Sequence, residues 1–127
     1  MADPKTVVVI DDASLVRLYY RTTLEKAGFR VAEALNGLEA LEKLPGLDAD
    51  LLIVDVNMPQ MDGFSFLKAL RQSDPAIASL PALVTSTESR TVDFDAARAA
   101  GANYYLVKPL SQDTLVSVAR LLCGLPQ

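Results

Sequence analysis

The sequence of 127 residues contains no histidine and only one cysteine, Cys123. Without histidine, the chain cannot build a Ser-His-Asp or Cys-His triad, the usual zinc sites or the commonest general base. A single cysteine excludes an internal disulfide and suits a reducing cytoplasm. Any chemistry must therefore use carboxylates, hydroxyls and lysine.

Long apolar runs are also absent. The longest are about half the length of a membrane span, and the N-terminal MADPKT lacks the apolar region of a signal peptide. The net charge of −4 argues weakly against nucleic acid as a direct partner. Half of the residues are apolar, so we expect one globular domain over residues 1–127, in the cytoplasm and without membrane attachment.

Five short apolar or β-branched runs alternate with segments of helical spacing. The runs are residues 6–10, 30–34, 51–54, 81–85 and 103–107. Strict strand–helix alternation predicts an α/β fold with a parallel sheet covered by helices on both faces. The first, third and fourth runs are apolar throughout, as expected of central strands, whereas the mixed RVAEA at 30–34 fits an edge.

Five helices are expected between and after these strands. The first, about Ser14 to Ala27, carries Leu15, Leu18, Tyr19 and Leu24 at helical spacing and stops at Gly28. Asn36 and Ser111 are expected N-caps of the second and last helices. The helix near residues 89–100 has only a faint apolar stripe, and we expect it to be the least stable.

Polar side chains gather at the ends of four predicted strands. They are Asp11 and Asp12 after the first, Asp55 and Asn57 after the third, Thr85, Ser86 and Thr87 at the fourth, and Lys108 and Pro109 at the fifth. Ligands of parallel sheets bind beyond the carboxyl ends of the strands. Each piece alone is commonly a turn or helix cap, but together they predict one site at this edge of the sheet.

The chemistry of this set suits phosphoryl transfer. Three neighbouring carboxylates repel one another, and a hard divalent cation such as Mg²⁺ relieves that repulsion. Lys108 offers a compact positive charge and the hydroxyl a hydrogen bond to phosphate oxygens. Asp55 can act as a nucleophile, because carboxylates form aspartyl-phosphates.

With these residues in place, the chain resembles the receiver domain of two-component response regulators, in particular the single-domain chemotaxis (CheY-like) type. The resemblance rests on VVVIDDAS, NGLEAL, DVNMPQMDG, PALVTST and AGANYYLVKPL and on the spacings between them. It implies a flavodoxin-like, doubly wound sheet of five parallel strands in the order 2-1-3-4-5, flanked by five helices.

The resemblance also implies a role for each matching residue. Asp55 corresponds to the phosphoacceptor, and Asp11, Asp12 and Asp55 would hold Mg²⁺ with the backbone carbonyl of Asn57. Lys108 corresponds to the lysine that contacts the phosphoryl group. It precedes Pro109, where the family usually has a cis peptide bond.

Two residues of the expected switch are assigned less directly. Thr85, Ser86 and Thr87 compete for the switch hydroxyl, and the family spacing, 5 residues after Pro81 and 22 before Lys108, selects Ser86. Tyr105 corresponds to the aromatic residue that rotates inward on activation. Its alternative role is packing on an edge strand, and Tyr104 lies beside it.

The implied function is a signalling switch that takes part in its own phosphorylation and dephosphorylation and is not otherwise an enzyme. A sensor histidine kinase or histidine phosphotransfer protein would donate the phosphoryl group. The surface of the fourth helix, fifth strand and fifth helix would then bind an effector protein, in chemotaxis or motility. Only GLPQ follows the last helix, so we expect no output domain, no direct DNA binding, and a monomer or weak dimer.

Other functions fit the sequence less well. A phosphorelay intermediate and a receiver cut from a larger regulator would look the same. A phosphatase resembling the haloacid dehalogenases needs a second Asp where this chain has Asn57. A nucleotide-binding module needs a glycine-rich phosphate loop, which follows none of the strands, and a purely structural receiver-like domain would have lost an acidic or lysine position.

Overall fold

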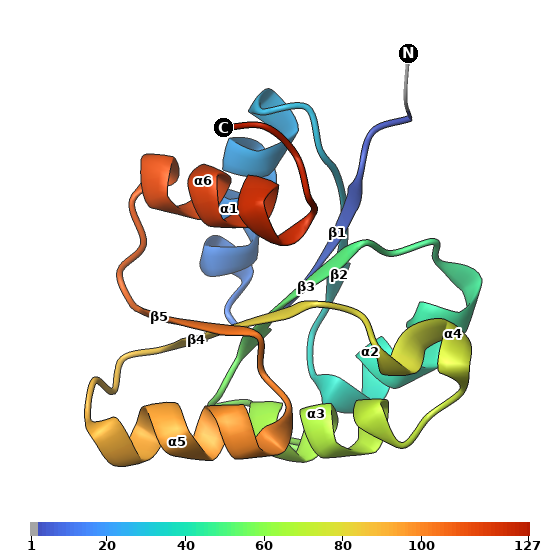
Figure 1. The fold of residues 1–127 in the computed structure, drawn as a ribbon, viewed down its shortest axis with the longest axis vertical. Helices are drawn as coiled ribbons and strands as arrows, with labels where there is room; N and C mark the ends of the chain where they lie inside the picture. Colours follow the sequence, from blue (N-terminus) through green and yellow to red (C-terminus); the bar gives the residue numbers. More distant parts are fainter. Residues whose placement is uncertain (1–2) are drawn as a thin grey trace.

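The computed structural model describes residues 3–127 and contains one sheet of five parallel strands (Figure 1). The strands are β1 (Thr6–Ile10), β2 (Arg30–Ala34), β3 (Leu51–Asp55), β4 (Ala82–Ser86) and β5 (Tyr104–Val107). Their order is β2-β1-β3-β4-β5, and every neighbouring pair is parallel. The predicted doubly wound α/β fold is confirmed, with RVAEA on an edge and the three apolar strands in the centre.

Helices cover both faces of the sheet. They are α1 (Ser14–Lys26), α2 (Gly37–Lys43), a 3₁₀ turn η1 (Leu44–Gly46), α3 (Gly63–Arg71), α4 (Pro75–Ala78), α5 (Thr91–Ala100) and α6 (Gln112–Leu122). In Figure 1, α1 and α6 lie on one side of the sheet and α2, α3 and α5 on the other. No helix within residues 3–127 is long and apolar enough to cross a membrane.

The prediction of five helices is wrong by one, because α4 is a sixth. It is a single turn with Asp74 before it and Pro75 at its first position. Four residues are too few to show a helical period, so only the Asp-Pro start signal was available in the sequence. The expected fourth and fifth helices are α5 and α6.

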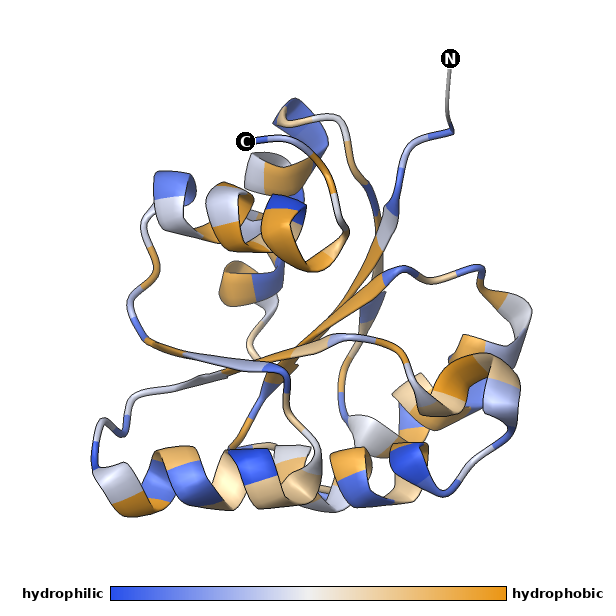
Figure 2. Cartoon of the chain, viewed as in Figure 1, coloured by the Kyte–Doolittle hydropathy of each residue, from blue (hydrophilic) through white to orange (hydrophobic). Residues whose placement is uncertain are grey.

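The side chains on the two faces of each central strand pack into two separate hydrophobic cores. Val8 and Ile10 of β1 pack with α2, α3 and α5, whereas Val7 and Val9 pack with α1 and α6. Figure 2 shows the central strands as hydrophobic along most of their length. Burial on both faces therefore fixes these strands, and with them the positions of their carboxyl ends.

Helix α1 presents a different face to the core from the one predicted. Of the four stripe residues only Leu24 is buried, while Leu15 and Leu18 are 78% and 57% exposed. Tyr20 and Thr23 point inward instead. Apolar residues on both sides of α1 made the stripe ambiguous, and the packing against β1 and α6 selects the face that carries Tyr20.

The predicted helix ends are confirmed. The side chain of Asn36 accepts a hydrogen bond from the Glu39 N–H, and that of Ser111 accepts one from the Thr114 N–H. Gly28 follows α1 with a φ of +96°, a conformation that glycine adopts without strain. These caps satisfy backbone groups that would otherwise be unpaired at the helix ends.

Candidate functional site

Three carboxylates meet at the carboxyl edge of the two central strands. Asp55 is the last residue of β3, and Asp11 and Asp12 directly follow its neighbour β1. One carboxylate oxygen from each residue lies within 4.8 Å of the other two. Asp11 and Asp55 are buried and Asp12 is exposed. The predicted acidic cluster therefore forms, with one side open to solvent.

Lys108 reaches this cluster from the far side of β4. Its Nζ lies 3.0 Å from Asp11 Oδ2 and 3.0 Å from Asp55 Oδ1. Burial disfavours the ammonium, but hydrogen bonds to both carboxylates outweigh burial and raise the pKa of Lys108. Lys108 thus stays charged and bridges two of the three acids.

The remaining negative charge is not neutralised by Lys108. Burial raises the pKa of Asp55, the hydrogen bond from Lys108 opposes that rise, and the charges of Asp11 and Asp12 add to it. Three carboxylates face one ammonium. A closely spaced set of carboxylate oxygens with excess negative charge fits a hard divalent cation.

The loop that carries Asp11 is held by hydrogen bonds from α1. Asp11 Oδ1 accepts from the Ala13 N–H at 2.9 Å, and Arg17 Nη1 donates to the Asp11 carbonyl at 2.7 Å. Arg17 Nε also donates to Glu33 on β2. Arg17 was not identified from the sequence, because nothing in its spacing marks it as a partner of the acidic pair.

The loop after β3 folds back close to the end of that strand. The Gly63 N–H donates to the Val56 carbonyl at 2.9 Å. A Cβ on Gly63 would collide with the backbone of Asp55 and Val56. Asn57 lies two residues beyond Asp55, in an exposed part of this loop. A residue without a side chain at position 63 is therefore what lets α3 begin beside Asp55.

The three candidate hydroxyls differ in their surroundings. Ser86 is buried, and its Oγ accepts a hydrogen bond from the Glu88 N–H at 3.1 Å. Thr85 is fully buried on β4, and Thr87 is exposed beyond the strand. The Lys108 N–H donates to the Ser86 carbonyl at 2.7 Å. Ser86 is therefore tied by its backbone to the lysine of the cluster.

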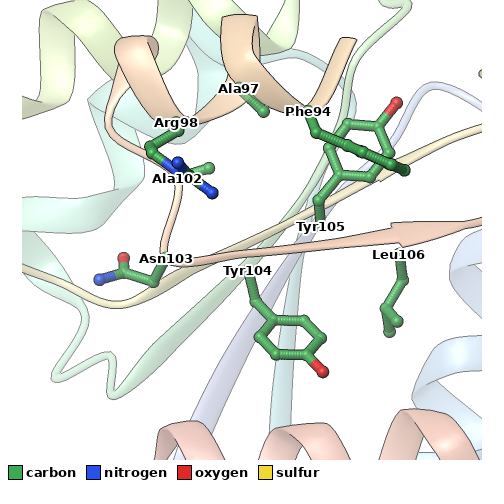
Figure 3. Close-up of a pocket in the computed structure, with 8 residues that line it drawn as sticks. All are labelled: Phe94, Ala97, Arg98, Ala102, Asn103, Tyr104, Tyr105 and Leu106. Atoms are coloured by element: carbon green, nitrogen blue, oxygen red, sulfur yellow. The ribbon is translucent and has the colours of Figure 1, made fainter. Parts of the chain in front are cut away.

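Tyr105 and Tyr104 point to opposite sides of β5 (Figure 3). The Tyr105 hydroxyl donates to the Glu88 carbonyl at 2.8 Å, and its ring meets that of Phe94 edge to face at 4.7 Å. Tyr104 is exposed on the other side. Glu88 thus links Ser86 to Tyr105, since its N–H donates to one and its carbonyl accepts from the other. The Lys108–Pro109 peptide bond is cis, as expected.

Comparison with known proteins identifies the family of this site. The family model of the response regulator receiver domain matches residues 7–120. The chain belongs to the response regulator receiver family. It is a receiver of the CheY type, and the phosphatase and nucleotide-binding alternatives are thereby superseded.

Named relatives agree with this family. The chain is 36% identical over 120 residues to chemotaxis protein CheY1 of Helicobacter pylori, covering 93% of this chain and 96% of the relative. The structure of CheY4 from Vibrio cholerae is similar with a TM-score of 0.88 and 35% identity, over 94% of this chain and 98% of that one. A response regulator structure from Chloroflexus aurantiacus has a TM-score of 0.89 and 33% identity, over 95% and 98%.

Proposed function

We propose that Asp55 accepts a phosphoryl group from a phosphohistidine on a sensor histidine kinase or a histidine phosphotransfer protein. The observation that carries this proposal is the position of Asp55, held at a buried strand end with Asp11, Asp12 and Lys108 around it. An oxygen of Asp55 attacks phosphorus, the P–O bond forms as the P–N bond breaks, and the imidazole leaves. The donor histidine belongs to the partner, since this chain has none.

Asp11, Asp12 and Asp55, with the backbone carbonyl of Asn57, would hold Mg²⁺. The bound cation would offset the charge of the carboxylates and of the phosphoryl oxygens. Lys108 turns from Asp55 to a phosphoryl oxygen, since that oxygen becomes the nearest strong acceptor for its ammonium. The Ser86 hydroxyl donates to another phosphoryl oxygen.

The switch is proposed to run from Ser86 to Tyr105 through Glu88. If the Ser86 hydroxyl turns to the phosphoryl group, its bond with the Glu88 N–H breaks and the segment that holds Tyr105 loosens. Tyr105 then moves inward, and the surface of α5, β5 and α6 changes. This is a shift between two packings that a local charge drives.

The α5–β5–α6 surface is the proposed docking site of an effector protein. It carries exposed apolar side chains from all three elements: Val92, Phe94, Tyr104, Val107 and Leu121. Exposed apolar groups of this kind mark protein contact sites. The relatives' names suggest chemotaxis as the pathway, and we place the protein in the cytoplasm, as a monomer or weak dimer that binds no DNA directly.

Uptake of one phosphoryl group from acetyl phosphate and Mg²⁺ tests the acceptor role. NMR spectra of the protein with and without phosphorylation test the switch. We expect shifts around Tyr105 and across residues 89–100, and unchanged spectra there would contradict the switch. A pull-down with the phosphorylated form and the Asp55→Asn variant then isolates partners that depend on the phosphoryl group.

A further inference from the structure

The three carboxylates of the acidic cluster are held in different ways. Lys108 lies 3.0 Å from an oxygen of Asp11 and 3.0 Å from an oxygen of Asp55, and thereby fixes both side chains. The carboxylate of Asp12 is exposed, and no hydrogen bond or ion pair holds it within residues 3–127. Its place in the cluster therefore depends on the backbone from which the side chain extends.

The backbone of Asp11, which leads into Asp12, is held at both its N–H and its carbonyl. The N–H donates to the Ala34 carbonyl at 3.2 Å, and the carbonyl accepts from Arg17 Nη1 at 2.7 Å. The Asp11 carbonyl belongs to the same planar peptide group as the Asp12 nitrogen. Arg17 therefore sets the orientation of the peptide group that carries Asp12.

Glu33 of the edge strand β2 holds Arg17 in this position. Its Oε1 accepts from Arg17 Nε at 2.9 Å, and its Oε2 accepts from Arg21 Nε at 2.7 Å. Burial raises the pKa of Glu33, but the hydrogen bonds from the two arginines outweigh burial and lower the pKa overall. Only 12% of the Arg17 side chain is exposed. Arg17 thus forms a fixed link between β2 and the acidic loop.

We propose that Arg17 is a positioning residue of the metal site, which orients Asp12 toward the cation through the Asp11 carbonyl. Groups that hold metal ligands in place affect metal affinity without touching the metal. Arg17 also carries a positive charge, which by itself would disfavour a cation at the cluster and which Glu33 offsets. The two effects of Arg17 on cation binding therefore have opposite signs. This inference rests on the proposed Mg²⁺ site.

The test compares the Mg²⁺ affinity of Arg17→Met with that of Arg21→Met, measured from amide NMR shifts during Mg²⁺ titration. Each variant removes one positive charge beside Glu33, but only Arg17 donates to the Asp11 carbonyl. We expect the affinity of Arg17→Met to fall about tenfold, and that of Arg21→Met to equal or exceed the wild-type value. An affinity of Arg17→Met equal to or above the wild type, or equal losses in both variants, would overturn the inference.

Two further variants separate positioning from charge and from stability. Arg17→Lys keeps the charge without the planar fork, so its affinity should lie between those of Arg17→Met and the wild type. Wild-type affinity in Arg17→Lys would overturn the inference even if Arg17→Met does not fold. Arg71→Met removes a hydrogen bond to the Leu80 carbonyl, at the other end of β4, and should bind Mg²⁺ as the wild type does.

Thermal unfolding without Mg²⁺ establishes that each variant is folded at the temperature of the titration. A loss of affinity in Arg71→Met as large as that in Arg17→Met would mean that lost stability alone explains the effect, and would also overturn the inference. A wild type that binds Mg²⁺ keeps the proposed metal site whatever the variants do, whereas a wild type that does not bind it removes both.

Discussion

Lys108 Nζ lies 3.0 Å from Asp55 Oδ1, although β4 separates the strands that carry the two residues. The two groups of this ion pair have different electrostatic surroundings. Lys108 has two carboxylate partners and its pKa is raised, whereas Asp55 is buried among like charges and its pKa is raised as well. The ammonium is therefore favoured and the Asp55 carboxylate is not, as expected for a site that accepts a further cation.

Asp55→Asn should stabilise the fold at neutral pH. A raised folded-state pKa means that ionisation of Asp55 disfavours the folded protein. The contribution of protonated Asp55 is fully present below the ordinary value of 3.8 and is lost as the pH rises through the higher folded value. We expect a gain of about 1 kcal/mol in the free energy of unfolding at pH 7, and none below pH 3.8. Urea unfolding of both proteins at the two pH values measures it.

Lys108→Met should destabilise the fold, because it leaves Asp11 and Asp55 with no cation between them. The expected loss is about 3 kcal/mol in urea unfolding with a chelator present. Mg²⁺ should restore more stability to this variant than to the wild type. The exposed Lys68 provides the control, since Lys68→Met should change stability little. Equal stability of Lys108→Met and the wild type would mean that the ammonium does not offset the repulsion between the two carboxylates.

Gly63→Ala should disturb the site through the backbone. The added methyl group would collide with the Asp55 and Val56 backbone, which cannot move without shifting the end of β3. We expect a loss of about 2 kcal/mol in stability and slower uptake of the phosphoryl group from acetyl phosphate. At Gly46 a Cβ meets nothing within 4 Å, so Gly46→Ala is the matched control. Similar behaviour of the two variants would contradict this account of the β3–α3 connection.

Arg71 should be important for stability but not for the chemistry. Its guanidinium donates to the carbonyls of Ala78, Leu80 and Gly101, and thereby joins α3 to the segments before β4 and after α5. Arg71→Met leaves these carbonyls unpaired, and we expect a loss of about 3 kcal/mol. Arg71→Lys should lose less, because its ammonium can still donate to one of these carbonyls. It should remain below the wild type, since one ammonium cannot replace the fork.

Two quantities are measured for Arg71→Met: the stability to urea, and the rate of phosphorylation at urea concentrations below the unfolding transition. Substitution of the exposed Arg30 by methionine serves as control. A phosphorylation rate that falls in Arg71→Met while stability is unchanged would show that this network acts on the site and not on the fold.

The architecture was predictable from the sequence because the clearest sequence patterns, the apolar runs, reflect which residues are buried. Strands β1, β3 and β4 are apolar along most of their length since both faces are covered, and the polar residues at their ends stand out in the sequence. Asp11, Asp12 and Asp55 were identified in this way. Strand ends of a parallel sheet converge by topology, so the cluster followed from the strand assignment alone.

Features that depend on the packing of particular side chains were not predictable. The predicted inward face of α1 was wrong because apolar residues lie on two sides of the helix. The burial of Tyr20 became clear only from the packing. Helix α4 is too short to leave a period. Arg17 and Arg71 each donate to backbone carbonyls, which every segment offers, so no sequence pattern distinguishes these partners.

The most direct test of the central claim is the intact mass of the protein after incubation with acetyl phosphate and Mg²⁺. We predict one added phosphoryl group on the wild type, none with a chelator of Mg²⁺, and none on Asp55→Asn. Asp62→Asn, which alters an exposed carboxylate at the start of α3, should be phosphorylated as the wild type is. A wild type without the added mass, or Asp55→Asn with an undiminished one, would contradict the assignment of Asp55 as the phosphoacceptor.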